Sequence, residues 1–138
     1  MVDALCRAHT MLKPDGCIVD LHPSAALAVV EVAGQRTGFV QTDDGPLRHA
    51  AAGVALGVVL NEGLFTIDRS IEFAYYTYAD TIEALRDYVL AKWTGSWIAE
   101  ETVERTREAV RRSPGVRPRV RERVLVTRLL PRVGLLGL

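Results

Sequence analysis

The sequence VDALCRAHTMLKPDGCIVDL, residues 2–21, divides into three parts with different patterns. Apolar side chains recur at helical spacing over Val2–Leu12, which predicts an amphipathic helix. Pro14 ends that pattern and Gly16 lets the chain reverse, so residues 13–16 are expected to form a turn. Cys17–Leu21 is nearly all apolar and predicts a strand covered on both faces. The chain therefore opens with a helix, a turn and a buried strand.

Two further β-like runs follow, at Leu27–Val32 and Thr37–Thr42. Ala33–Arg36 lies between them and is typical of a hairpin turn. Asp43–Pro46 combines a capping acid with an early proline, which signals the start of a helix. That helix is expected over Leu47–Glu62, and its many alanine and glycine residues predict that it is largely buried.

The second half of the chain contains two alternating strands separated by two helices. Phe65–Tyr75 alternates between apolar and polar side chains, which predicts a half-solvated, antiparallel strand. Asp80–Glu83 resembles a capping box with aspartate in place of serine or threonine, and it opens a helix that carries Ile82, Leu85, Val89 and Leu90. Ile98–Arg112 is predicted to form a second, charge-rich helix, and Val116–Leu130 the last strand.

The composition fits one soluble domain. The chain has 138 residues, 49% of them apolar and 25% charged, and its formal net charge of zero provides no field to attract nucleic acid or anionic lipid. Its longest apolar run, Ala50–Leu60, is shorter than the roughly 20 residues that span a bilayer. With no signal-peptide pattern, we expect a cytoplasmic protein without a membrane partner. Cys6 and Cys17 fit neither a zinc site nor a redox pair and are expected to be reduced, buried thiols.

Residues 4–16, ALCRAHTMLKPDG, together with the strand that follows them, resemble the entry to the fifth strand of class I S-adenosylmethionine-dependent methyltransferases. Such families carry leucine, lysine or arginine, proline and two glycines at the turn. Asp15 stands in place of the first glycine, and aspartate accepts turn conformations. A weaker match is Tyr75–Tyr78 followed by the helix start at Thr81–Leu85, similar to an aromatic, turn and helix beside the substrate of many small-molecule methyltransferases.

The resemblance implies an α/β fold: a partial Rossmann-like methyltransferase sheet with one buried strand, an antiparallel pair at the edge, and flanking helices. In that family the fifth strand is parallel to its neighbours, and the last two strands form the antiparallel pair. Cys17–Leu21 would match the fifth strand, Phe65–Tyr75 the sixth and Arg119–Leu130 the seventh. We expect a single partial domain over residues 1–131 and a C-terminal tail over residues 132–138.

The chain departs from the family in its donor-binding half. It contains no Gly-x-Gly-x-Gly loop and no acidic residue that closes a second strand to hold ribose hydroxyls. S-adenosylmethionine is therefore the cofactor that the resemblance implies, but it is not expected to bind this chain alone. Half an open sheet would also leave an unpaired edge along Cys17–Leu21. A truncated or split gene product, a partner that supplies the other half, and an independent fold with a local resemblance all remain open.

Three functions follow from these alternatives. The first is a truncated or split methyltransferase-like domain that contributes the acceptor side of a small-molecule methyltransferase and is inactive alone, so whether the chain is an enzyme stays open. The second is a non-catalytic α+β module that self-associates or binds a partner. The expected partners are a second copy or a complementary N-terminal half, with a small-molecule acceptor in an active complex. The third, a nucleic-acid binder, depends on an arginine stripe and is not favoured.

His22 is the one candidate catalytic residue, because it follows the fifth-strand candidate and ligands gather at the carboxyl ends of strands in open α/β sheets. The resemblance makes it a base or a substrate contact; the alternative is a local cap of the strand end. Asp20 lies inside the apolar strand and is either a proton acceptor with a raised pKa or, the interpretation we favour, a carboxylate at the exposed end of the strand that accepts hydrogen bonds from backbone amides. No metal site is expected, since His9, His22 and His49 lack ligand spacing.

Tyr76 and Tyr78 are the other candidate substrate-binding residues, because they lie near a strand end in the most aromatic part of the chain. Packing of the aromatic side chains against the sheet is the alternative. No cofactor-binding residue is identified.

Arginine side chains line one side of the last strand, at Arg117, Arg119, Arg121 and Arg123. Asp68 and Glu72 lie on the polar side of the other alternating strand. If the two strands pair, these stripes meet in cross-strand ion pairs worth about 0.2–1 kcal/mol each. We favour that interpretation over contacts with nucleic-acid phosphates, because the chain is neutral and carries no recognised nucleic-acid motif.

Overall fold

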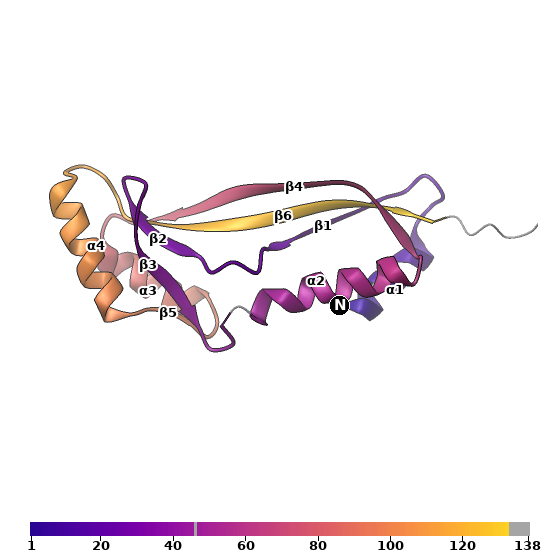
Figure 1. The fold of residues 1–138 in the computed structure, drawn as a ribbon, viewed down its shortest axis with the longest axis horizontal. Helices are drawn as coiled ribbons and strands as arrows, with labels where there is room; N and C mark the ends of the chain where they lie inside the picture. Colours follow the sequence, from indigo (N-terminus) through magenta and orange to yellow (C-terminus); the bar gives the residue numbers. More distant parts are fainter. Residues whose placement is uncertain (46, 133–138) are drawn as a thin grey trace, which may run out of the picture. The chain divides into compact units, whose positions relative to one another are not determined.

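The structure is a computed structural model that describes residues 1–45 and 47–132. Its elements in chain order are α1 (Val2–Met11), β1 (Ile18–Pro23), β2 (Val29–Val32), β3 (Gln35–Thr42), α2 (Leu47–Asn61), β4 (Phe65–Tyr78), α3 (Ile82–Lys92), β5 (Ser96–Ile98), α4 (Glu100–Arg112) and β6 (Arg119–Pro131) (Figure 1). The predicted mixed α/β class is confirmed. Every strand pair of defined register is antiparallel. The parallel pairing that the resemblance implies for the strand Cys17–Leu21 is therefore wrong for its described partner, because β1 pairs with β6 antiparallel. Residues 133–138 of the predicted tail lie outside the described residues.

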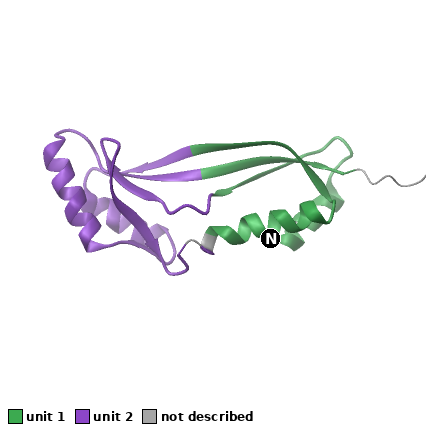
Figure 2. Ribbon diagram, in the orientation of Figure 1, with its two compact units in different colours: residues 1–23, 49–73, 124–138 green, residues 24–48, 74–123 purple. Residues whose placement is uncertain are grey.

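The chain divides into two compact units (Figure 2). Unit 1 comprises Met1–Pro23, His49–Phe73 and the chain from Val124 onward, and unit 2 comprises Ser24–Arg48 and Ala74–Arg123. Strands β4 and β6 contribute residues to both units. The expectation of one partial domain over residues 1–131 stays a prediction.

Unit 1 packs α1 and α2 against one face of its strands (Figure 2). β1 pairs with the second part of β6, from Ile18↔Leu129 to Pro23↔Val124. The helix, turn and strand predicted at the start of the chain are confirmed, with the Gly16 amide donating to the Lys13 carbonyl across the turn at 2.9 Å. The core of this unit consists of Leu5, Leu56, Val59, Phe65 and Leu129.

The prediction that β1 is covered on both faces is wrong. Ile18 packs against the core, but Val19 and Leu21 point the opposite way and are 60% and 61% exposed. Successive side chains of a strand alternate between faces, and the two helices of unit 1 cover only the face of Ile18. The expectation of two buried thiols also fails, because Cys6 is half-buried and Cys17 is exposed, although both cysteines are free.

Helix α2 is less buried than its composition predicts. Of the side chains described in this helix, Ala55, Leu56 and Val59 are buried, and Val54 on another side is 67% exposed. A Cβ built on Gly53 would meet no atom within 4 Å, so no neighbouring backbone approaches the helix at that position. The small residues therefore do not mark a close contact here.

Unit 2 is built around the predicted β2–β3 hairpin. Ala33 and Gly34 form its turn with φ angles of 51° and 78°, and two positive φ values are the signature of a type I′ turn. β2 also pairs with the first part of β6, and β3 pairs with β5. The core beneath α3 and α4 consists of Val30, Val40, Ile82, Leu85, Val89, Ile98, Val103 and Val120.

The helix starts in unit 2 differ from the sequence-based expectations by one or two residues. Thr81 rather than Asp80 caps α3, because its Oγ1 accepts a hydrogen bond from the Ala84 amide at 3.1 Å. Ile98, expected at the start of a helix, belongs to β5, which was not predicted, and α4 begins at Glu100.

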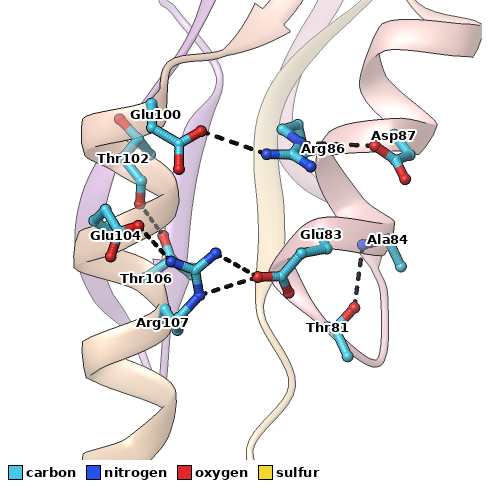
Figure 3. A network of polar contacts seen from close by, with 10 residues as sticks. All are labelled: Thr81, Glu83, Ala84, Arg86, Asp87, Glu100, Thr102, Glu104, Thr106 and Arg107. Carbon is cyan, nitrogen blue, oxygen red and sulfur yellow. Dashed lines mark hydrogen bonds and ion pairs between the residues drawn. The ribbon is translucent and has the colours of Figure 1, made fainter.

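Glu83 joins α3 to α4 rather than completing a capping box. The Arg107 guanidinium donates to Glu83 Oε1 from Nε at 3.0 Å and from Nη2 at 2.6 Å, and it also bonds Glu104 (Figure 3). The hydrogen bond from Arg107 holds the pKa of the Glu83 carboxyl below its ordinary value. Arg86 and Glu100 form a second bridge between the helices at 3.4 Å.

β3 approaches α4 closely at Gly38. The Thr102 Oγ1 atom lies 2.2 Å from the position that a Cβ on Gly38 would occupy. Beside it, the buried hydroxyls of Thr37 and Thr106 lie 2.7 Å apart, and each also lies within hydrogen-bond distance of a backbone carbonyl, at Val30 and Thr102 respectively. Only a residue without a side chain fits between this strand and this helix.

Candidate functional site

The strongest polar contact of unit 1 joins Asp20 and His22. The two residues alternate on β1, so their side chains point to the same face of the strand. His22 Nδ1 lies 2.7 Å from Asp20 Oδ2, and the side chains are only 12% and 13% exposed. A carboxylate that accepts from Nδ1 fixes the tautomer and leaves Nε2 as a proton acceptor. The hydrogen bond described for Asp20 is made to the side chain of the predicted site residue His22, not to backbone amides at an exposed strand end as we expected.

Two hydroxyl groups extend this polar region across the strands of unit 1. Thr127 of β6 faces Asp20 in the antiparallel register, and its Oγ1 lies 3.1 Å from Ser70 Oγ of β4. The arrangement provides one imidazole, one carboxylate and two hydroxyls at the edge of an apolar core. Sequence reasoning identified His22 and Asp20 but missed Thr127 and Ser70, because their proximity depends on the pairing of three strands.

Tyr76 and Tyr78 lie next to each other on β4 in unit 2, with ring centroids 6.2 Å apart. Both are exposed, and both contact Arg119: its guanidinium carbon lies 4.2 Å from the Tyr76 ring centroid, and its Nη1 donates to the Tyr78 hydroxyl at 2.9 Å. Arg117 lies 5.3 Å from the Tyr78 ring centroid. The two predicted substrate contacts are thus arranged as a platform on which arginine side chains of the same chain already stack.

Sequence reasoning missed Glu31, which contacts Arg119 beside the two tyrosines. Its side chain is 4% exposed, and it accepts hydrogen bonds from Arg119 Nε at 2.7 Å and from Arg121 Nε at 3.2 Å. The hydrogen bond to Tyr78, followed by those to Glu31, raises the pKa of Arg119. A single acid inside the run Val29-Val30-Glu31-Val32 is the signal that marked a buried ion pair.

The predicted ion pairs between the arginine stripe and β4 are wrong for Arg119 and Arg121, although β4 and β6 do pair. Both arginines bind Glu31 of β2, because β2 is the neighbour of this part of β6. Asp68 instead lies 3.3 Å from Arg128, further along β6. A double-mutant cycle between Arg121 and Asp68 would therefore test no contact.

Glu122 is half-buried on β6, and its burial raises the pKa of its carboxyl above the ordinary value of 4.5. As the pH rises, the Glu122 carboxyl therefore ionises at a lower pH in the unfolded chain than in the folded chain. Above about pH 4.5, Glu122 thus lowers the free energy of unfolding. We expect Glu122→Gln to unfold at higher urea concentration than the wild type at pH 7. The difference should disappear below pH 4.5 in a urea titration followed by circular dichroism, and an equal difference at both pH values would contradict this reading.

A groove of about 290 Å³ lies on unit 2 between β3 and α4, and Arg36, Phe39, Glu101 and Arg105 are among its lining residues. Its charges are internally paired, since Arg105 and Glu101 are 3.0 Å apart and Arg36 lies over the Phe39 ring at 4.9 Å. The groove presents no unpaired nucleophile or acid–base pair within its lining residues.

His22 belongs to unit 1, and the two tyrosines belong to unit 2. Within residues 1–45 and 47–132, three or more His, Cys, Asp or Glu side chains do not gather into a group that could hold a metal ion. A search of the same residues identifies no helix of sufficient length and apolarity to cross a membrane. Comparisons of the chain with protein-family models, with curated proteins and with solved structures find no match.

Proposed function

We propose that this chain supplies the acceptor side of an S-adenosylmethionine-dependent methyltransferase-like domain, with the donor-binding part contributed by another polypeptide segment. The observation that carries the proposal is the pairing of β6 with β4. These are the strands matched to the seventh and sixth strands of the family, and the resemblance expects these two strands to pair. The proposal thus includes a partial Rossmann-like sheet, which is a more specific fold assignment than the mixed α/β class.

The unpaired edge of β1 and its exposed apolar side chains support a complementary segment from another polypeptide. Among the described residues β1 pairs with β6 alone, which leaves its other edge without a strand. Val19 and Leu21 project from the same strand and are more than half exposed. In the family the fifth strand has parallel neighbours, so a complementary segment would pair with this edge, and a further element of that segment would have to lie over the face of these two side chains. Burial of such side chains contributes about 1.5–3 kcal/mol each to an association.

The residues of this chain do not fit the cofactor by themselves. The 138 residues contain no Gly-x-Gly-x-Gly loop that could place backbone amides around it. No step that involves the cofactor is therefore assigned to this chain. Its own contribution would be a proton acceptor at His22 Nε2, held in position by Asp20 near the carboxyl end of β1. Tyr76 and Tyr78 belong to unit 2, and their contact with a small-molecule acceptor is a separate proposal that assigns no common site with His22.

A second candidate function is a non-catalytic module that binds a partner. The exposed apolar side chains of β1 favour it equally, because a binding surface needs no cofactor. The two candidates differ in what the completed complex binds.

Co-purification followed by calorimetry separates these candidates. The tagged chain is co-expressed with the polypeptide segments encoded next to it, and any complex is titrated with S-adenosylmethionine. We expect no binding by the chain alone and binding by the complex, with the complex lost in Leu21→Asp and kept in Leu90→Asp, a matched change at an exposed leucine of α3. A complex that requires Leu21 but does not bind S-adenosylmethionine would favour the partner-binding module and exclude the methyltransferase proposal.

A further inference from the structure

We propose that the side of the unit 2 sheet that faces away from α3 and α4 binds a single strand of nucleic acid. The bases of the strand stack on exposed aromatic side chains, and its phosphates contact arginine side chains. All the residues concerned belong to unit 2. The proposal goes beyond the methyltransferase proposal and does not depend on it. It gives Tyr76 and Tyr78 bases as their ligands in place of a small-molecule acceptor.

The register of the strands defines which side chains share this side of the sheet. Val30, Val40 and Val120 point into the core beneath α3 and α4, so their neighbours along each strand point the opposite way. Facing residues of an antiparallel pair lie on the same side of a sheet. Two rows therefore cross this side, which we call the outer face: Arg119, Glu31 and Arg36 in one row, and Arg121, Val29 and Phe39 in the other.

Aromatic side chains are exposed on both flanks of the outer face. Tyr76 and Tyr78 of β4 contact Arg119 and are 37% and 47% exposed. On the other flank, Trp97 of β5 is 40% exposed. Because its neighbour Ile98 points into the core, Trp97 points toward the outer face. Exposed rings on a sheet surface provide platforms on which the unpaired bases of a single strand stack.

The charge of the outer face favours an anionic partner. Its two rows contain three arginines and one carboxylate, Glu31. Glu31 is 4% exposed and binds both Arg119 and Arg121, so positive charge remains in excess on this surface. Arg36 is exposed and lies over the Phe39 ring at 4.9 Å. Arginines beside exposed rings complement the phosphates and the bases that a single strand presents.

Two arguments that the sequence offered against this partner do not hold for the outer face. Asp68, which was expected to neutralise the arginine stripe, lies against Arg128 in unit 1 instead. The other argument was the zero net charge of the whole chain. Salt screens exposed charges from one another beyond about 8 Å at physiological ionic strength, so the charges of the outer face itself determine the attraction.

Fluorescence anisotropy with the full chain tests the proposal, with a labelled oligouridylate of about 12 nucleotides as the probe. We expect saturable binding that weakens about 20-fold between about 50 and 200 mM salt, the loss for three phosphate contacts on a single strand. The same strand in a duplex should bind more weakly, because paired and stacked bases cannot stack on side chains. Absence of binding, binding that salt does not weaken, or a preference for the duplex would each overturn the proposal.

Matched variants locate the contact on the outer face. Tyr78→Ala should weaken binding at least about fivefold through the loss of one stacked base, whereas Tyr78→Phe keeps the ring and should bind like the wild type. Tyr88→Ala is the control, at a tyrosine of α3 that is 45% exposed. Equal losses in Tyr78→Ala and Tyr88→Ala would contradict a site on the outer face.

The arginine contacts have their own pair of variants. Arg36→Gln should reduce the slope of log affinity against log salt concentration by about 0.7, the contribution of one phosphate contact on a single strand. Arg111→Gln on α4, where the side chain is 70% exposed, should leave the slope unchanged. Circular dichroism confirms that each variant is folded, and equal slopes for the two variants would contradict the proposal. None of these outcomes bears on binding of S-adenosylmethionine by a complex.

Discussion

Replacement of Glu31 by glutamine is expected to lower the free energy of unfolding by about 2–3 kcal/mol. Glu31 is buried and binds both Arg119 and Arg121, so the substitution leaves two guanidinium groups without their shared carboxylate. Breaking a fully buried pair costs about 3–5 kcal/mol, but these arginines are 26% and 29% exposed and regain part of their hydration. Urea denaturation followed by circular dichroism measures the loss.

Glu108→Gln is the matched control for this substitution. Glu108 also contacts two arginines, Arg111 and Arg112, but all three side chains are 48% exposed or more. Exposed ion pairs of this kind contribute about 0–1 kcal/mol, so the control should change stability little. If Glu31→Gln and Glu108→Gln had equal effects, the interpretation of Glu31 as the buried centre of a charge cluster would be wrong.

Gly38→Ala is expected to lower the free energy of unfolding by about 1–3 kcal/mol, because it overfills the contact between β3 and α4. The new Cβ would lie 2.2 Å from Thr102 Oγ1, 2.5 Å from its Cγ2 and 2.9 Å from its Cβ. Rotation of the Thr102 side chain could move Oγ1 and Cγ2 but leaves its Cβ in place, because that atom is attached to the helix backbone. The strand or the helix must shift, and thermal or urea unfolding reports the cost.

Two further variants distinguish overpacking from a general effect of glycine replacement. Gly53→Ala adds the same methyl group inside α2, where no atom lies within 4 Å, and should stabilise the chain by up to about 1 kcal/mol through helix propensity. Adding Thr102→Ala to Gly38→Ala removes the two closest atoms and should recover part of the loss. Strict additivity of the Gly38 and Thr102 changes would contradict a direct contact.

The elements that the sequence predicted are those defined by local patterns. Helical spacing, the turn at Lys13–Gly16 and the alternation of Phe65–Tyr75 all depend on neighbouring residues, and each was found near its expected bounds. β5 was missed because three residues carry no periodicity and the strand exists through its pairing with β3. The exposure of Val19 and of α2 was missed for a related reason, since burial depends on what covers an element rather than on its own composition.

The contacts of the candidate site also separate into local ones, which the sequence can predict, and long-range ones, which it cannot. Asp20 and His22 are two positions apart on a strand, so their contact was within reach of sequence reasoning, as was that of Tyr76 with Tyr78. The partner of Arg119 was not, because Glu31 lies 88 positions away and is brought to it by the register of β2 and β6. A pattern of charges predicts that a strand needs a partner of opposite charge without identifying which strand supplies it.

The place of β6 in the chain order affects how the protein is made. β6 pairs with β1, β2 and β4, all of which leave the ribosome before it. Contacts between distant residues give a fold a high contact order, which slows folding because long loops must close first. The β2–β3 hairpin can form as soon as its two strands have been synthesised. β1 and β4, in contrast, lack their partner strand until Arg119–Pro131 has been synthesised. The nascent chain therefore exposes the apolar side chains of β1 and β4 until β6 has been synthesised, and we expect it to depend on chaperones during that interval.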